Sequence, residues 1–285
     1  RAGCPKRTSG EMAWARPGDR KPTNEIFVGL GDERQPRMTS PKTIDLNCDL
    51  GEGAGHDAAV MPLISSANIA SGGHAGNRQS MLAAVTLARD HGVAIGCHPG
   101  HDDPAHFGRR PLPISPEAAA DLIASQLTRF AAITGADLHH VKLHGALYHQ
   151  VGNDEALAAV VSRRLATDWP QLALFAAAGS RLAVIAREEG LRVAAEAFAD
   201  RRYDARGGLV PRSDANAVID CPETAAAQAV AIVSTGRVTA ATGSAVSIAA
   251  DTLCIHGDEA DPAGCLRAIH AAFAANGITV GPAFR

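Results

Sequence analysis

The residues from 43 to 52, Thr43-Ile44-Asp45-Leu46-Asn47-Cys48-Asp49-Leu50-Gly51-Glu52, alternate polar and apolar side chains. Successive side chains of a β-strand point to opposite faces, so Asp45, Asn47 and Asp49 share one face and the apolar residues share the other. The apolar face can pack on helices, which leaves the polar face to line a barrel. Two carboxylates and an amide directed inward are costly unless they bind something. The alternative is an edge strand with a solvated polar face.

The chain from Met38 onward repeats one pattern, in which a short apolar run and a polar loop precede a longer segment of helical period. Strands that alternate with helices imply a parallel sheet. Seven such units over about 240 residues fit a closed (β/α) barrel better than a doubly wound sheet. Residues 278–280 form an eighth strand or a tail, and residues 238–240 and 246–249 form an inserted hairpin. The seven predicted strands are residues 43–48, 67–70, 93–97, 138–143, 172–175, 191–195 and 251–255.

Composition narrows the class of protein. Hydrophobic residues make up 46% of the 285 residues, which excludes a disordered chain. Only 4% of residues are aromatic and the net charge is −3, so we expect no nucleic-acid partner. No run of 18 apolar residues occurs, so no membrane span is expected. The six cysteines lack zinc-site spacing and three lie in apolar runs, which suits buried reduced thiols and a cytoplasmic location.

The first 37 residues differ from the rest. They hold eight Lys and Arg against five Asp and Glu, contain no histidine and show no sustained periodicity. We expect residues 1–37 to be a disordered N-terminal extension and residues 38–285 to be a single barrel domain. The alternative for the extension is a basic docking arm.

Polar residues follow the predicted strands at their carboxyl ends, where barrels of this kind carry their chemistry. A lone histidine there is more often structural than catalytic, but histidines beside Asp or Lys at four or more strand ends indicate an active site. The candidates after the first strand are Asn68, His74, His98, Lys142, His144, Glu196, Asp200, Arg201, His256 and Asp258. The expected bystanders are His91, His101, His106, His139, His149 and His270.

Familiar nucleotide and hydrolase motifs are missing from the sequence. There is no Gly-Lys pair and so no Walker phosphate loop, and no G-x-S-x-G elbow. Residues 51–56 lack the last glycine of a dinucleotide fingerprint and follow acidic residues. A serine hydrolase or a simple nucleotide-binding fold therefore has no support.

From about Lys42 to its C-terminus the chain resembles the LamB/YcsF family, which supplies the A subunit of bacterial ATP-dependent 5-oxoprolinase. Ser71, Gly73, Leu143 and His149 depart from the usual pattern, where Cys, an aromatic residue, Pro and Asn are common. The matching stretches are residues 45–52, 66–77, 98–100, 107–110, 141–148, 196–203, 208–212 and 252–258.

The resemblance implies a seven-stranded barrel related to carbohydrate deacetylases. It also implies that 5-oxo-L-proline is opened to L-glutamate at the expense of ATP, and that activity needs separate B and C subunits. ATP is then used by the complex. Whether a divalent metal is needed stays open, and no residues are assigned as metal ligands. Coupling to ATP would make the carbonyl oxygen of an unreactive lactam a better leaving group.

The residues fit this reaction in a working hypothesis. A general base would come from Asp49, His74 or His98. Lys142 and His144 would stabilise a developing oxyanion or phosphate. The substrate carboxylate would be oriented by Asn47, Asn68, Arg201 and Arg212. Asp200 completes the predicted catalytic set, and the remaining predicted substrate-binding residues are Asp45, Glu52, Glu196, His256 and Asp258.

Two other functions remain open at this point. The chain could be a stand-alone metal-dependent deacetylase, with Asp49, His74 and His98 holding a divalent ion. It could also be a non-catalytic binding or regulatory subunit that needs only the pocket. Metal analysis and an assay on an acetylated sugar separate the first alternative from 5-oxoproline hydrolysis.

Overall fold

The computed structural model describes residues 42–284, so the predicted N-terminal extension lies outside the described residues. Seven parallel strands form a closed ring, because β1 pairs with β2 on one side and with β9 on the other. This ring confirms the predicted (β/α) barrel, and each predicted strand overlaps an observed one. The barrel strands are β1 (Lys42–Leu50), β2 (Ser66–Ala70), β3 (Ala94–His98), β4 (Leu138–Lys142), β5 (Ala173–Ala177), β6 (Arg192–Phe198) and β9 (Thr252–Ile255).

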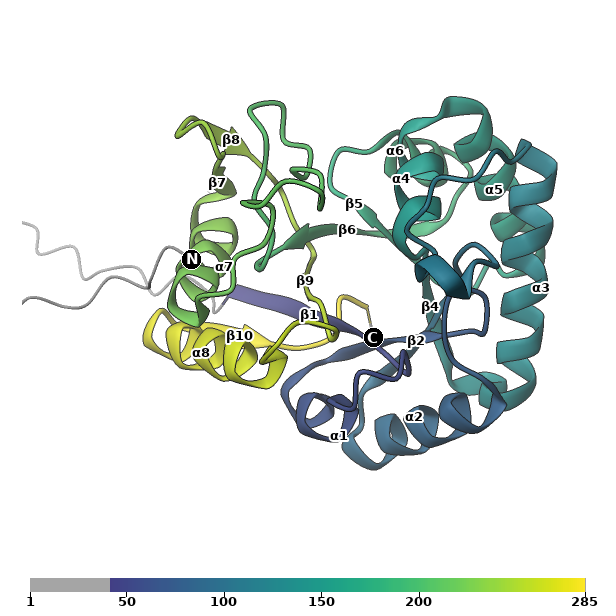
Figure 1. The fold of residues 1–285 in the computed structure, drawn as a ribbon, viewed down its shortest axis with the longest axis horizontal. Coiled ribbons are helices and arrows are strands. Elements are labelled where there is room, and N and C mark those ends of the chain that lie inside the picture. Colours follow the sequence, from purple (N-terminus) through teal and green to yellow (C-terminus); the bar gives the residue numbers. More distant parts are fainter. Residues whose placement is uncertain (1–41, 285) are drawn as a thin grey trace, which may run out of the picture. The chain divides into compact units, whose positions relative to one another are not determined.

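Helices surround the ring of strands (Figure 1). Side-chain caps fix the starts of several of them: Asn77 forms a capping box at α2, and Ser115 accepts from the amide of Ala118 at α3. Asp154 caps α5. The helices are α1 (Asp57–Val60), α2 (Arg78–His91), α3 (Pro116–Thr134), α4 (Gly145–Asn153), α5 (Glu155–Asp168), α6 (Arg181–Glu188), α7 (Pro222–Thr235) and α8 (Pro262–Ala275), with short 3₁₀ turns at Met61–Leu63, Pro104–His106 and Gly135–Asp137.

The two remaining sequence expectations concern short strands. β7 (Arg237–Thr239) and β8 (Ala245–Ser247) form the predicted antiparallel hairpin. β10 (Ile278–Val280) pairs in parallel with the first residues of β1 and stands outside the closed ring. The eighth strand therefore exists but does not widen the barrel.

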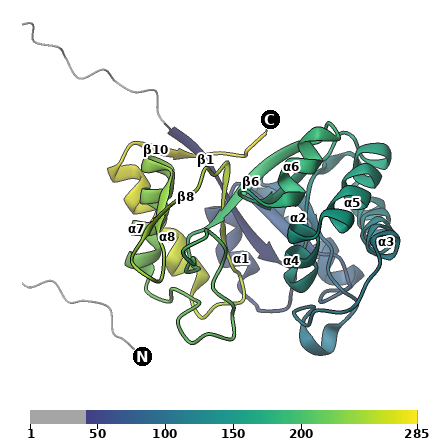
Figure 2. The ribbon, with the colours of Figure 1, turned by 90° about the horizontal axis from the view of Figure 1, so that it is seen from above.

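The C-terminal residues cover the amino-terminal end of the barrel. Phe284 packs against Ala173, Phe175 and Ala194, and its carbonyl oxygen lies 3.2 Å from His139 Nε2. Figure 2 shows the C-terminus at the same end of the barrel as the start of β1. One end of the barrel is thus plugged, which leaves the carboxyl ends of the strands for a site.

As the sequence predicts, the alternating residues of β1 place apolar side chains on one face of the strand and polar side chains on the other. Leu46 and Leu50 join the main apolar core, and Asp45, Asn47 and Asp49 are all buried. Three cysteines predicted to be buried thiols are free and buried in the structure: Cys48, Cys97 and Cys254. No helix of residues 42–284 is long and apolar enough to cross a membrane.

Candidate active site

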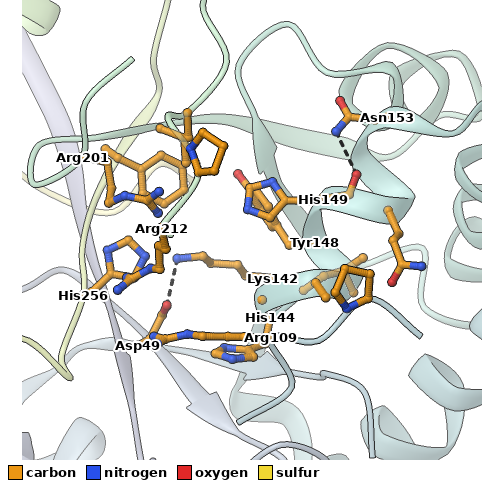
Figure 3. Close-up of a pocket in the computed structure, with 18 of the residues that line it drawn as sticks. Asp49, Arg109, Lys142, His144, Tyr148, His149, Asn153, Arg201, Arg212 and His256 are labelled. Atoms are coloured by element: carbon orange, nitrogen blue, oxygen red, sulfur yellow. Dashed lines mark hydrogen bonds and ion pairs between the residues drawn. The ribbon is translucent and has the colours of Figure 1, made fainter. Parts of the chain in front are cut away.

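A cavity of about 430 Å³ opens at the carboxyl ends of the strands (Figure 3). Its volume lies within the range of small-molecule sites. The predicted site residues that line it are Asp49, His98, Lys142, His144, Arg201, Arg212 and His256. The other predicted residues are not part of this lining.

Lys142, the last residue of β4, is a buried cation at the base of the cavity. Its Nζ lies 2.8 Å from Asp49 Oδ1, 2.9 Å from Glu196 Oε1 and 3.0 Å from Cys254 Sγ. Burial alone would lower the pKa of Lys142, but the surrounding negative charge, Asp49 foremost, holds this pKa well above its usual range. Burial would raise the pKa of Asp49, but His98 and Lys142 hold it well below the usual range. Asp49 and Lys142 therefore form a charged pair at the base of the cavity.

Amides lie beneath this pair. Lys142 Nζ donates to Asn47 Oδ1 at 3.1 Å, and Asn68 Nδ2 donates to Asn47 Oδ1 at 2.7 Å and to Asp49 Oδ1 at 2.9 Å. His140 Nε2 lies 2.9 Å from Asn68 Oδ1. Asn47 and Asn68 thus hold Asp49 and Lys142 in place and do not line the cavity.

Asp45 is buried and does not line the cavity. Its Oδ1 accepts from the hydroxyls of Ser65 and Ser66 at 2.6 and 2.7 Å, and its Oδ2 accepts from the hydroxyl of Thr252 at 2.5 Å. Burial raises the pKa of Asp45 from 3.8 to about 6, although these hydroxyls oppose the shift. Asp45 lies within a hydroxyl-lined layer below the site.

Three histidines and a carboxylate form a compact cluster beside the charged pair. The rings of His74 and His144 stack at 3.6 Å, and the ring of His98 meets both edge-on. Glu52 Oε1 lies 2.9 Å from His74 Nε2 and 3.3 Å from His144 Nδ1. Burial, with His98 as a second cause, lowers the pKa of His74 to about 2. The same causes hold the pKa of His144 well below its usual range, so both rings are neutral near pH 7.

Two glycines explain how these rings fit together. A Cβ on Gly100 would lie 2.7 Å from His74 Nδ1, and a Cβ on Gly108 would lie 2.6 Å from His74 Cβ. Gly108 also has a φ of +62°, a conformation that L side chains rarely adopt. These two glycines lie in the loop after β3, and their lack of a Cβ leaves room for the side chain of His74.

The outer wall of the cavity is cationic. Arg201 donates to the carbonyl oxygens of Val210 and Ala217, which fixes its position in the wall. Arg212 Nη1 donates to Glu259 at 3.0 Å, and its buried Nη2, 4.0 Å from Asp258 Oδ1, has no hydrogen-bond partner among residues 42–284. Figure 3 shows both arginines on the same side of the cavity as His256. A buried guanidinium nitrogen without a hydrogen bond suits an anionic ligand.

Three further predicted residues contact side chains that line the cavity. Asp200 Oδ2 accepts from the backbone amide of His256 at 2.7 Å and lies 2.8 Å from its Nδ1, so it fixes the ring. Asp258 pairs with Arg109. Glu196 accepts from the hydroxyl of Tyr148 at 2.8 Å in addition to its contact with Lys142.

Three residues of the lining with titratable side chains are not among the predicted site residues, namely Arg109, Tyr148 and His149. Arg109 lies in one of the stretches that match the family, but no function is predicted for it from the sequence. Tyr148 follows His144 by four residues, the spacing of neighbours on one helix face, which could have placed it at the site. His149, an expected bystander, lines the cavity.

Among residues 42–284, two groups of side chains bring metal-ligand atoms within 4.8 Å of one another. One holds Glu52, His74, His98 and His144, and the other holds Asp49, Cys254 and His256. The ligand set of the deacetylase alternative, Asp49 with His74 and His98, is divided between these groups.

Comparison with known proteins supports the resemblance seen in the sequence. Residues 44–285 match the model of the LamB/YcsF family. A protein of Symbiobacterium thermophilum, named as the A subunit of 5-oxoprolinase, is 47% identical over 248 residues, which cover 84% of this chain and 95% of that protein. A protein of the same name from Bordetella parapertussis is 46% identical over 245 residues, which cover 83% of this chain and 97% of that protein. The crystal structure of the lactam utilization protein from Thermus thermophilus superposes with a TM-score of 0.78 at 41% identity, covering 84% of this chain and 99% of that one. The chain belongs to the LamB/YcsF family.

Proposed function

We propose that this protein is the A subunit of a multi-subunit 5-oxoprolinase, a cytoplasmic hydrolase that opens 5-oxo-L-proline to L-glutamate with consumption of ATP. The observation that carries the proposal is a cavity with a buried Asp49–Lys142 pair at its base and two arginines in its wall. The names of its relatives, the A subunit of 5-oxoprolinase and the lactam utilization protein, point to the same chemistry.

The two ends of the cavity match the two ends of the substrate. 5-Oxo-L-proline carries a carboxylate and, across the ring, a lactam carbonyl. Arg212, whose buried Nη2 has no hydrogen bond within residues 42–284, and Arg201 of the same wall bind the carboxylate. The lactam carbonyl then faces Lys142, whose buried ammonium stabilises negative charge on that oxygen.

Asp49 serves as the proton acceptor for the attacking water. Its low pKa keeps it ionised at neutral pH, and His98 Nε2 lies 3.4 Å from its Oδ2. His74 is excluded as the base in this scheme because it lies behind the lining and is stacked on His144. His144 Nε2 lies 2.9 Å from the carbonyl oxygen of Phe107, so this ring supports the site rather than an oxyanion.

In the scheme, transfer of the γ-phosphoryl group of ATP to the lactam oxygen activates the carbonyl carbon for addition of water. The ring C–N bond then breaks as the nitrogen takes up a proton, and a second water releases phosphate from the resulting acyl phosphate to give glutamate. The sequence has no Walker loop, so nucleotide binding is completed by the partner B and C subunits. The cationic wall of the cavity, with Arg109 and Lys142, is suited to a phosphorylated intermediate.

The test is reconstitution of the complex. The purified chain is mixed with its B and C subunits, 5-oxo-L-proline and ATP, and glutamate and phosphate are measured, with each component omitted in turn. The proposal predicts glutamate only when all three subunits are present. Acetate release from an acetylated sugar by this chain alone would instead support the deacetylase alternative. Binding of 5-oxoproline without a contribution to turnover would support a non-catalytic role.

A further inference from the structure

The hydrogen bonds of two buried histidines determine which of their nitrogens carry hydrogen. His98 Nδ1 lies 2.8 Å from the carbonyl oxygen of Lys142, and His144 Nε2 lies 2.9 Å from the carbonyl oxygen of Phe107. A carbonyl oxygen only accepts, so His98 Nδ1 and His144 Nε2 are the N–H donors. In the neutral rings His98 Nε2 and His144 Nδ1 are left with bare lone pairs.

These two bare nitrogens face each other at 3.0 Å. Two lone pairs at that distance repel each other unless a positive charge lies between them. Glu52 Oε1 also approaches, at 3.3 Å from His144 Nδ1 and 3.9 Å from His98 Nε2, while Asp49 Oδ2 lies 3.4 Å from His98 Nε2 only. Three electron-pair donors thus converge on one point, from three separate elements of the barrel mouth.

We propose that His98 Nε2, His144 Nδ1 and Glu52 Oε1 bind one divalent transition-metal ion of the zinc class. Tetrahedral zinc bonds of about 2.0–2.1 Å place neighbouring ligand atoms about 3.3 Å apart. The three separations of 3.0, 3.3 and 3.9 Å lie around this value. His98 and His144 both line the cavity, so a fourth coordination position is open to it, as in catalytic sites with two histidines and one glutamate.

The neighbours of these ligands have the arrangement that metal-bound histidines require. Each of His98 and His144 donates its other ring N–H to a backbone carbonyl, which fixes the tautomer and the ring orientation. His74 Nδ1 is buried without a hydrogen-bond partner among residues 42–284, so its Nε2 carries the hydrogen and donates to Glu52 Oε1 at 2.9 Å. His74 is therefore a positioning residue for the carboxylate.

The stacking of His74 on His144 excludes His74 as a fourth ligand. The two ring centroids are 3.6 Å apart and the ring planes are 4° from parallel, and a ring nitrogen directs its lone pair within the ring plane. An ion cannot lie in both planes. The rings of His98 and His144, in contrast, are 88° apart, so their lone pairs can converge.

The donor set also selects the ion. Two imidazole nitrogens and one carboxylate oxygen suit zinc and its neighbours, whereas magnesium and calcium prefer oxygen ligands. The other candidate for the positive charge is a proton shared between His98 and His144. The inference does not depend on the proposed 5-oxoproline chemistry, because the site is defined without any substrate.

Metal binding to the full chain, without substrate or the B and C subunits, tests the inference. The chelator-treated protein is titrated with Zn²⁺ by calorimetry and with Co²⁺ by visible absorption, against a background of Mg²⁺. We expect one tight site per chain and a Co²⁺ spectrum of low coordination number. The variants E52Q and H144Q should each bind at least about 100-fold more weakly, and H74F, which keeps the stacked ring, about 10–100-fold more weakly.

H106Q is the matched control, because His106 is a half-exposed histidine that pairs with Asp103 outside the cluster. It should bind metal as the wild type does. Absence of stoichiometric binding by the wild type would overturn the inference in favour of the shared proton. Equal binding by E52Q, H144Q and H106Q would overturn it as well. The wild-type titration decides the matter even if a variant fails to fold.

Discussion

Lys142 Nζ lies 2.8 Å from Asp49 Oδ1, and the pair spans the lumen of the barrel. Lys142 ends β4 and Asp49 lies near the end of β1, strands separated in the ring by β2 and β3. The contact therefore exists only because the sheet closes. We therefore expect the Asp49–Lys142 pair to contribute both to the stability of the barrel and to the proposed reaction.

Replacement of Lys142 by Met should be severe for both stability and activity. It leaves the buried carboxylates of Asp49 and Glu196 without their cation, and removing one partner of a buried pair costs about 3–5 kcal/mol. Glutamate formation by the complex should fall about 10²–10³-fold. Urea unfolding and the reconstituted assay measure the two effects.

Arg181→Ala is the control for Lys142→Met. Arg181 pairs with Glu155 at 2.8 Å, but both side chains are mostly exposed, and such pairs contribute less than about 1 kcal/mol. If the two variants lose similar free energies of unfolding, the buried pair does not have the importance that we assign to it.

Asp45 should make stability depend on pH in an unusual direction. Its pKa is about 6 in the folded protein and 3.8 in a free chain, so the folded state binds the proton more readily. The contribution of Asp45 to the free energy of unfolding therefore grows as the pH falls from about 6 to about 4. Asp45→Asn keeps the hydroxyl contacts to Oδ1 but removes the titration.

Unfolding of wild type and Asp45→Asn is compared at pH 7, 6, 5 and 4. The difference should shift in favour of the wild type by about 2–3 kcal/mol across this range. A difference that does not vary with pH would show that Asp45 titrates as a solvent-exposed carboxyl.

Gly108→Ala should disturb the histidine cluster. The new Cβ would lie 2.6 Å from His74 Cβ, in addition to the cost of a positive φ, about 1–2 kcal/mol. Gly243→Ala is the matched control, because Gly243 has a φ of +85° and nothing within 4 Å of the new Cβ. We expect both variants to lose stability and only Gly108→Ala to lose activity. Equal turnover by the two would mean that the packing of His74 does not matter to the site.

Arg212→Leu should weaken substrate binding more than it slows the chemical step. Loss of a hydrogen bond to a charged group costs about 1.5–3 kcal/mol, so KM for 5-oxo-L-proline should rise about 10–100-fold with a smaller change in kcat. Glu259→Gln removes only the negative charge of the outer partner of Arg212 and should leave KM close to the wild-type value. An unchanged KM in Arg212→Leu would remove this residue from the carboxylate site.

The strand ends could be predicted from the sequence because alternation and helix caps are local signals. These signals predict that Asp49, His98 and Lys142 lie at strand ends, and all three line the cavity. Alternation identifies a face but not a depth, and for this reason Asp45 and Asn47 share the face of Asp49 yet do not line the cavity.

The missed residues depend on how distant segments pack. Arg109 reaches the cavity from the loop after β3, and His149 reaches it from α4. The interaction of Glu52 with the histidine cluster depends on a turn after β1 that no sequence period describes. The lone-pair geometry of His98 and His144 needs the carbonyl positions, which only the folded backbone supplies.

The most direct test of the central claim is glutamate formation from 5-oxo-L-proline and ATP by the reconstituted complex, with wild type and Asp49→Asn compared. The account predicts glutamate and phosphate with wild type and a near-complete loss with the variant, while circular dichroism shows both chains folded. Wild-type turnover by Asp49→Asn, or the same yield from the B and C subunits without this chain, would contradict the account.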